Sequence, residues 1–279
     1  MPENTTITWL GHATWRILTP GGVTVMVDPW LASNPRCPEA EHEASADVVL
    51  VTHGHGDHVG DAVAVARRGN ATTIAQYELA GWLGEQGAPD VIGMNAGGTV
   101  AVRGLKVTMT HAFHSSSTPD GAYGGDPVGY VLELESGQRI YIAGDTGVFG
   151  DMALIGELYA PVLAILPIGD LYTMGPFQAA HAVRLLGVRH VLGSHWGTFD
   201  ALTKIKYRRN AAIACKMVTE AVDILHEMMG ANGIYDSAPL QRRFRDAHAA
   251  AGHINFNMDT QLPLWGQVAL GGAYTSPTF

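Results

Sequence analysis

A dense group of imidazole and carboxylate side chains occurs at residues 52–58, with the sequence THGHGDH. His53, His55, Asp57 and His58 fall within six residues, and the glycines between them let the backbone turn so that these side chains converge. Imidazole and carboxylate together suit zinc, manganese or iron rather than calcium. The alternative interpretation is a polar surface turn, but a motif this dense seldom arises without a ligand. The segment therefore predicts a transition-metal site.

The segment follows Asp47–Val51 (DVVLV), a continuous apolar run that is typical of a strand buried on both faces. The rest of the first 200 residues shows short strands separated by glycine-rich turns, with fewer helices. Further strands are expected at Thr6–Leu10, Thr14–Leu18, Val23–Val27, Val100–Val102, Lys106–Met109, Gly129–Glu133, Arg139–Ile142, Leu163–Leu166 and Val191–Leu192, and helices at Asp61–Arg68, Glu78–Glu85 and Phe177–Leu186. Strands with interspersed helices predict an α/β fold in which helices cover the sheets.

The pattern His-x-His-x-Asp-His after a strand resembles the signature of the metallo-β-lactamase superfamily. The resemblance covers about residues 6–199 and implies an αββα sandwich with a one- or two-metal site at the sheet edge. The likeness is greater to a branch of metal-dependent hydrolases whose natural substrates are mostly unknown. The motifs that carry this likeness are WLGHAT at 9–14, FHSS at 113–116, GDTGVFGDM at 144–152 and YTMGP at 172–176.

The resemblance also implies a role for single residues. One ion would be held by His53, His55 and His114, the other by Asp57, His58 and His195, and both by Asp145. Asp28, in the segment VDPW at 27–30, matches an early aspartate that supports the ligands from behind.

Two further histidines leave alternatives open. His111 lies three residues before His114 and offers a ligand in its place, because a strand end can present either side chain. His12 either faces the site as a supporting or substrate-contacting group or is a core histidine with its own partners. With Asp57, it is a candidate catalytic residue. The side chains expected to be structural or on the surface are His42, His181 and His190. Asp170 is expected to fix its loop through hydrogen bonds, and the alternative for it is a role in the site.

The ligand set implies hydrolysis. Two divalent ions, zinc by preference and manganese or iron as alternatives, lower the pKa of a bound water from roughly 15.7 to about 7. Asp57 would orient the nucleophile or shuttle a proton. Ser115–Pro127 is either the substrate loop or a plain surface loop. We expect a dinuclear metal-dependent hydrolase of a small ester, lactone, phosphodiester or activated aryl ether. The alternatives are an iron-containing redox enzyme on the same fold and a subunit of a larger assembly.

The composition of the chain excludes several classes of protein. The chain has 279 residues, of which 47% are hydrophobic and 15% charged, with a net charge of −9. These figures exclude disorder and coiled coil, and no apolar run is long enough to span a membrane. The acidic balance argues against nucleic-acid binding. Two cysteines, Cys37 and Cys215, and a start without the pattern of a signal peptide lead us to expect a cytoplasmic protein.

The composition changes near Lys204. Residues 1–200 contain 9 Lys/Arg and 20 Asp/Glu, a charge of −11, whereas residues 201–279 contain 8 and 6, a charge of +2. A helix is expected at Arg208–Met229, and Ser237 is placed to cap a second one that runs through Leu240, Phe244 and Ala251. The helix carries an apolar stripe formed by Ile213, Met217, Ala221, Ile224 and Met228. We therefore predict a hydrolase domain at 1–203 and a helical extension at 204–279.

The extension, over roughly Arg208–Gly272, resembles the C-terminal helices of the acyl-CoA dehydrogenase superfamily, especially its flavin-dependent aromatic monooxygenases. The segments RNAA at 209–212, GANGIY at 230–235, PLQR at 239–242 and FRDAH at 244–248 carry the resemblance. Most of that parent fold is absent, so no intact flavin site is expected. We interpret the chain as a gene fusion whose tail either caps the sandwich or mediates homo- or hetero-oligomer formation. A hydrolase joined to part of an aromatic monooxygenase suggests a role in xenobiotic degradation.

Overall fold

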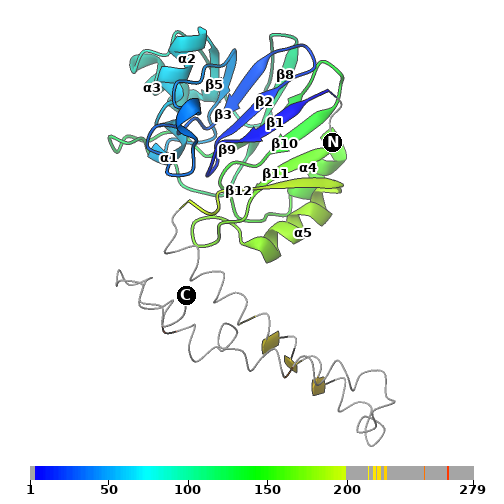
Figure 1. Ribbon diagram of the computed structural model, residues 1–279. Coiled ribbons are helices and arrows are strands. Elements are labelled where there is room, and N and C mark those ends of the chain that lie inside the picture. The colour runs from blue at the N-terminus through cyan, green and yellow to red at the C-terminus, as the bar shows by residue number, and fades with distance from the viewer. Residues whose placement is uncertain are drawn as a thin grey trace, which may run out of the picture. The chain divides into compact units, whose positions relative to one another are not determined.

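The computed structural model describes residues 4–198 and, beyond them, helical positions at 213, 216–217, 219–220, 223–224, 248 and 263. The chain divides into two compact units, Met1–Thr198 and Phe199–Phe279. The boundary predicted between residues 203 and 204 falls outside the described residues and stays a prediction. Unit 1 is an α/β sandwich (Figure 1).

The first sheet is built by the N-terminal half of unit 1. Its strands pair in chain order, antiparallel from β1 to β3 and parallel from β3 to β6. They are β1 (Thr6–Trp9), β2 (Trp15–Leu18), β3 (Thr24–Val27), β4 (Val48–Leu50), β5 (Thr72–Gln76) and β6 (Asp90–Met94). The helices of this half are the 3-10 turn η1 (Glu39–Glu41), α1 (Gly56–Val59), α2 (Ala62–Gly69) and α3 (Tyr77–Glu85).

The second sheet has the order β12-β11-β10-β9-β8-β7, with β7 to β10 antiparallel and β10 to β12 parallel. Its strands are β7 (Thr99–Val102), β8 (Leu105–His111), β9 (Val128–Glu133), β10 (Arg139–Ile142), β11 (Leu163–Pro167) and β12 (His190–Ser194). The helices α4 (Met152–Tyr159) and α5 (Pro176–Leu186) cover its outer face.

Three apolar layers hold the sandwich together. Val48 and Ile74 of the first sheet pack with Met109 and Ile165 of the second in the central layer. The outer layers join each sheet to its own helices. Strand β4 is buried throughout, as its continuous apolar run predicts. The order helix, sheet, sheet, helix confirms the expected αββα sandwich.

Five of the described elements are absent from the sequence-based prediction: the short η1 and α1, and the longer β5, β6 and α4. Strand β5 (TTIAQ) is buried at all five positions, so it has no polar–apolar alternation. Gly93 interrupts β6, and Gly156 interrupts the apolar run of α4. Short apolar segments of this kind suit a strand or a helix equally well, and only packing decides between them.

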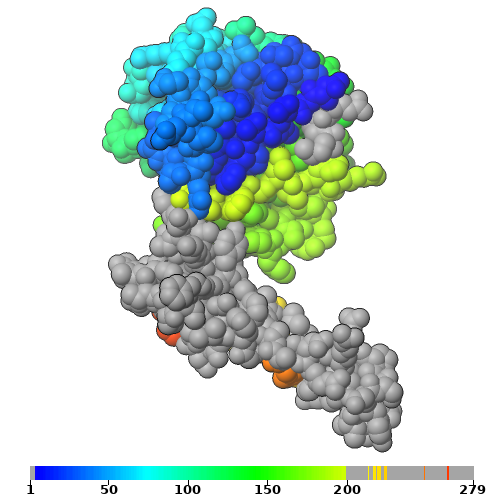
Figure 2. All heavy atoms as spheres, viewed as in Figure 1, coloured from blue at the N-terminus to red at the C-terminus, as the bar shows by residue number. Residues whose placement is uncertain are grey.

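The two sheets also meet along one edge, where β1 and β12 come together. The rings of Trp9 and Trp196 stack with centroids 4.9 Å apart, and His12 forms an antiparallel bridge with Trp196. The indole of Trp15 donates a hydrogen bond to Ser194 Oγ at 3.1 Å. Figure 2 shows the blue N-terminal strands against the yellow-green end of unit 1. The first and last motifs of unit 1 are thereby placed side by side.

In unit 2 the described positions are helical, and most fall in the predicted helices. The side chains of Ile213, Met217 and Ile224 are exposed. Asp223 of the first predicted helix pairs with His248 of the second at 3.1 Å. Among the helices that the structure describes, none combines the length and apolar character needed to cross a membrane.

Candidate metal centre

Five strand ends supply the side chains of the site. Residues 53–58 follow β4, and His114 follows β8. Asp28, Asp145 and His195 follow β3, β10 and β12. These strands run in the same direction within each sheet, so their carboxyl ends lie at one edge.

Gly144 shapes the approach to Asp145. Its φ is +64°, and a Cβ there would lie 2.7 Å from Val128 O and 2.9 Å from Thr52 Cβ. Only glycine tolerates both the conformation and the contact. The chain can therefore leave β10 tightly and bring Asp145 into the site.

The first donor group consists of His53, His55 and His114, whose ring nitrogens lie within 4.8 Å of one another. His53 Nε2 faces His55 Nδ1 at 2.9 Å. Two imidazole nitrogens of a tetrahedral zinc site lie about 3.3 Å apart, given zinc–nitrogen bonds of about 2.0–2.1 Å. Burial lowers the pKa of all three histidines. Neutral imidazoles keep the lone pairs that a metal needs.

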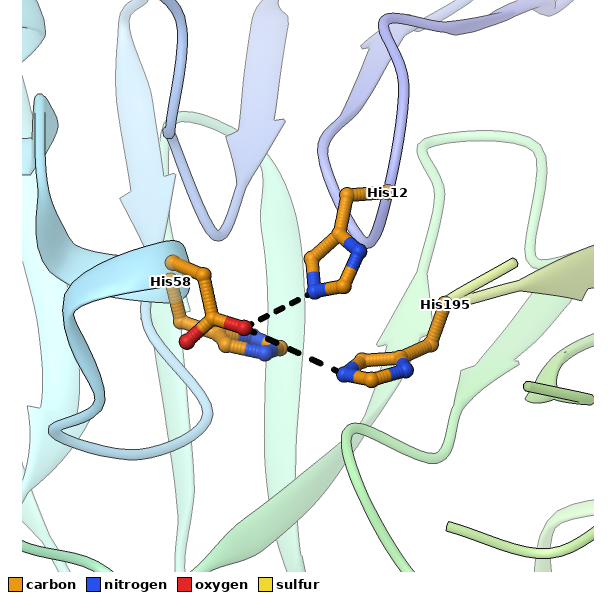
Figure 3. A group of neighbouring side chains, drawn as sticks. His12, His58 and His195 are labelled. Carbon is orange, nitrogen blue, oxygen red and sulfur yellow. Dashed lines mark hydrogen bonds and ion pairs between the residues drawn. The ribbon is translucent and has the colours of Figure 1, made fainter. Parts of the chain in front are cut away.

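The second donor group consists of Asp57, His58 and His195, with His12 beside them. His195 Nε2 lies 4.0 Å from Asp57 Oδ2, and His12 Nε2 lies 2.9 Å from the same oxygen. Figure 3 shows these two interactions as dashed lines, with His58 close by. The carboxylate of Asp57 is partly exposed, whereas the imidazole of His58 is fully buried.

Asp145 lies between the two groups. Its Oδ2 is 2.9 Å from His195 Nε2, 3.4 Å from His58 Nε2 and 3.7 Å from His114 Nε2. Asp145 Oδ1 and His58 Nε2 are buried and have no hydrogen-bond partner. Buried polar atoms without partners are costly unless a ligand satisfies them. The donor set therefore fits divalent cations in both positions.

The charges in the second donor group also favour a bound cation. Burial favours the neutral form of His58, but the carboxylates of Asp145 and Asp28 outweigh it and hold the pKa of His58 well above its ordinary value. Burial likewise raises the pKa of Asp145, and the facing His58 and His195 more than reverse this, so its pKa lies well below the usual range. The pKa of Asp57 is also lowered, because its hydrogen bond with His12 and the nearby histidines outweigh burial. The carboxylates are thus ionised and in need of positive charge.

Asp28 and Thr52 fix the ring orientations from behind. Asp28 accepts hydrogen bonds from the Thr52 amide at 2.7 Å and from His58 Nδ1 at 2.9 Å. The Thr52 hydroxyl donates to Asp28 Oδ2 at 2.7 Å and accepts from His53 Nδ1 at 3.1 Å. Each histidine therefore turns its Nε2 into the site. Thr52 belongs to the segment THGHGDH but has no predicted role, although its place directly before His53 is a usable signal.

The structure places the two histidines for which alternatives were open. His114 lies in the first donor group, whereas the side chain of His111 is 42% exposed and faces Asp151 at 3.7 Å. His12 is buried and contacts Asp57. Within residues 4–198, the histidines at 42, 181 and 190 belong to none of the donor groups.

The loop at residues 115–127 borders the first donor group. Ser115 Oγ lies 3.5 Å from His55 Nε2, and Ser116 Oγ accepts a hydrogen bond from the Gly54 amide at 3.2 Å. Phe113, just before the loop, is 63% exposed. This segment is placed to contact a molecule that approaches the metal centre.

The model of the β-lactamase superfamily domain matches residues 23–196, which contain all seven predicted ligands. The chain belongs to the β-lactamase superfamily. A UPF0173 metal-dependent hydrolase of Rubrobacter xylanophilus is 54% identical over 218 residues, 76% of this chain and 90% of the relative. Another, of Methanopyrus kandleri, is 50% identical over 199 residues, 70% of this chain and 86% of the relative. This superfamily member is a metal-dependent hydrolase.

Solved structures agree with the superfamily fold. The metallo hydrolase Igni18 of Ignicoccus hospitalis is 36% identical, with a TM-score of 0.63, over 70% of this chain and 84% of that one. An isothiocyanate hydrolase from Delia radicum gut bacteria is 22% identical, with a TM-score of 0.54, over 70% of this chain and 85% of that one. At this identity, the second likeness shows the fold alone.

A second family model matches the chain beyond the β-lactamase domain. It is the acyl-CoA dehydrogenase C-terminal domain, and it matches residues 182–258. The match begins before Arg208, where the resemblance was expected to start, and its first residues overlap the β-lactamase match. The likeness predicted for the extension is confirmed, with a different start.

Proposed function

We propose that this metal-dependent hydrolase is dinuclear and binds two zinc ions. His53, His55 and His114 would hold one ion, Asp57, His58 and His195 the other, and Asp145 both. The observation that supports this most directly is the place of Asp145 Oδ2, within 3.7 Å of nitrogens from both groups. The same nitrogen and oxygen donors also suit manganese or iron, which are the alternatives to zinc.

Divalent ions held by these residues would supply a hydroxide nucleophile at neutral pH and would stabilise an oxyanion. The chain's own contribution comes from Asp57, whose low pKa keeps it ionised and able to accept a hydrogen bond from the attacking water. Its partial exposure leaves this carboxylate accessible from the side of the substrate. Asp28 and Thr52 hold the rings of His58 and His53 throughout the reaction.

The proposed substrates are small molecules with an electrophilic carbon or phosphorus: an ester, a lactone, a phosphodiester or an activated aryl ether. The exposed ring of Phe113 lies beside His114 in the chain and offers an apolar contact for the substituent of such a molecule. Ser115 offers a hydroxyl next to His55.

Removal and return of metal tests this function. The full chain is stripped with a chelator, dialysed, and assayed on chromogenic esters, lactones, phosphodiesters and nitroaryl ethers before and after Zn²⁺, Mn²⁺ or Fe²⁺ is added. We expect the stripped protein to be inactive and zinc to restore at least one hydrolysis. His55→Ala should abolish the restored activity, and His111→Ala, the matched control, should retain it.

Two results contradict the proposal: hydrolysis that survives chelation, or no hydrolysis with any of the ions. Oxygen consumption that requires iron, without hydrolysis, would instead favour the iron-containing redox enzyme.

We also propose that residues 204–279 mediate association of the chain into an oligomer. The supporting observations are the match to the acyl-CoA dehydrogenase C-terminal domain and the exposed Ile213, Met217 and Ile224 at helical spacing. An apolar stripe on a helix is stabilised when it is buried against a partner.

A further inference from the structure

The turn that carries His12 lies directly against the turn that carries His195. The His195 amide donates a hydrogen bond to His12 O at 2.9 Å, and Trp9 Nε1 donates to the same oxygen at 2.9 Å. The rings of His12 and His195 have centroids 4.0 Å apart. The backbone therefore fixes His12 at the second donor group, independently of its side chain.

Both ring nitrogens of His12 face oxygen atoms. Nδ1 lies 2.6 Å from Thr198 Oγ1, and Nε2 lies 2.9 Å from Asp57 Oδ2. With an ionised Asp57, Nε2–H donates to the carboxylate and Nδ1 accepts from the Thr198 hydroxyl. The ring of His12 therefore links Thr198 to Asp57.

These contacts favour one of two roles for His12. Its Nε2 is near enough to the second donor group to be counted as a fourth ligand. However, both ring nitrogens already have oxygen partners, Thr198 Oγ1 at 2.6 Å and Asp57 Oδ2 at 2.9 Å, which places the ring to support the Asp57 carboxylate. A Thr-His-Asp nucleophile is also disfavoured, because Thr198 is only 6% exposed.

We propose that His12 is a positioning residue, which holds the carboxylate of Asp57 in its orientation toward His195 and is itself held by Thr198. The inference rests on the proposed function, since it concerns the second ion of that site. Partners outside the ligand shell that orient a ligand in this way typically change metal affinity 10- to 100-fold when they are removed.

Stepwise metal binding tests the proposal without any substrate. Stripped full-length protein is titrated with Co²⁺, and the absorbance and a competing chelator report the affinity of each ion. His12→Asn is the main variant, because His12 has a φ of +53° and asparagine tolerates this left-handed conformation. Thr198→Val removes the hydroxyl from the other end, Thr198→Ser keeps it, and His111→Asn is a histidine control outside the donor groups.

We expect His12→Asn to weaken the second ion about 10- to 100-fold and to leave the first unchanged. Thr198→Val should shift the second ion in the same direction by a smaller factor, and Thr198→Ser and His111→Asn should match the wild type. Circular dichroism of each variant confirms that it is folded. Unchanged affinities in both His12→Asn and Thr198→Val, or equal weakening of both ions, overturn the inference while the proposed function stands. A wild-type chain that binds a single ion overturns both.

Discussion

The carboxylate of Asp28 lies directly behind the imidazole of His58, with Oδ2 2.9 Å from Nδ1. Both side chains are almost completely buried. The same oxygen accepts from the Thr52 hydroxyl. The Asp28 carboxylate thus sets the orientation of the His58 imidazole and links it to Thr52, the residue before His53.

Asp28→Asn should weaken metal binding about 10- to 100-fold, mainly at the second ion. The amide has one acceptor oxygen fewer than the carboxylate, so at least one of its present bonds is lost. Metal titration with a competing chelator measures the change. Asp61→Asn is the matched control, because Asp61 Oδ2 accepts its hydrogen bonds from the Leu31 and Ala32 amides and not from the candidate ligands. An Asp28→Asn protein with wild-type affinities contradicts this role.

Tyr130→Phe should lower the free energy of unfolding by about 1–2 kcal/mol. Its hydroxyl donates to Val51 O at 2.7 Å, with Ile74 O at 3.2 Å, so it links the second sheet to the first. Urea unfolding of the stripped protein measures the effect without a contribution from metal. Tyr123→Phe, at an exposed position, should change it by less than about 0.5 kcal/mol. Equal effects of the two substitutions would rule out a special role for the buried bond.

The thiol of Cys37 should react slowly in the folded protein. Burial, with the carboxylates of Glu41 and Asp61, raises the pKa of Cys37 from 9.0 to about 11. At pH 8, about one thiol in a thousand is then ionised, and the rate should rise about tenfold per pH unit up to pH 10. Iodoacetamide labelling with peptide mass mapping measures this, and protein unfolded in guanidinium is the control.

The raised pKa of Cys37 also predicts how the stability of the fold changes with pH. The folded state holds the Cys37 proton more tightly than the unfolded state, so this group destabilises the fold as pH rises above 9.0, until about pH 11. Rapid labelling of folded protein at pH 8 would contradict both statements.

Truncation after Lys204 should yield a smaller assembly than the full chain. The removed residues include Ile213, Met217 and Ile224, whose exposed apolar side chains are the proposed contact. Light scattering at several concentrations measures the change in mass. Full-length protein carrying Ile213→Glu and Met217→Glu provides a second variant that keeps the chain length. If the full chain is already an active monomer and the truncated chain is an equally active monomer, the proposed association is wrong.

The candidate metal centre was largely predictable because its donors fall in short motifs next to strands. Residues 53–58 supply four donors that are local in sequence. His114, Asp145 and His195 required the family resemblance, since no local rule links three separate strand ends. The preference for His114 over His111 needed the fold, because only the folded chain places His114 with His53 and His55 and leaves His111 beside Asp151.

Other parts of the site depend on contacts that no motif encodes. Thr198 meets His12 only because β12 lies beside β1 and brings two distant turns together. Strand β5 was not predicted because it is buried at every position, which removes the periodicity that marks an element. Helix α4 was not predicted because it has apolar residues on its exposed side too, such as Leu154 and Leu158, so no single apolar stripe marks it. The stripe predicted at Ile213–Met228 lies only partly within the described residues, so its burial stays untested.

The number of metal ions per chain tests the central claim most directly. Elemental analysis of the purified full-length protein, reloaded with zinc and freed of excess metal, should give two ions per chain. Asp145→Asn should give fewer than two, because Asp145 lies between both donor groups. One ion or none in the wild type, or two ions in Asp145→Asn with wild-type affinity, would contradict a dinuclear centre shared through Asp145.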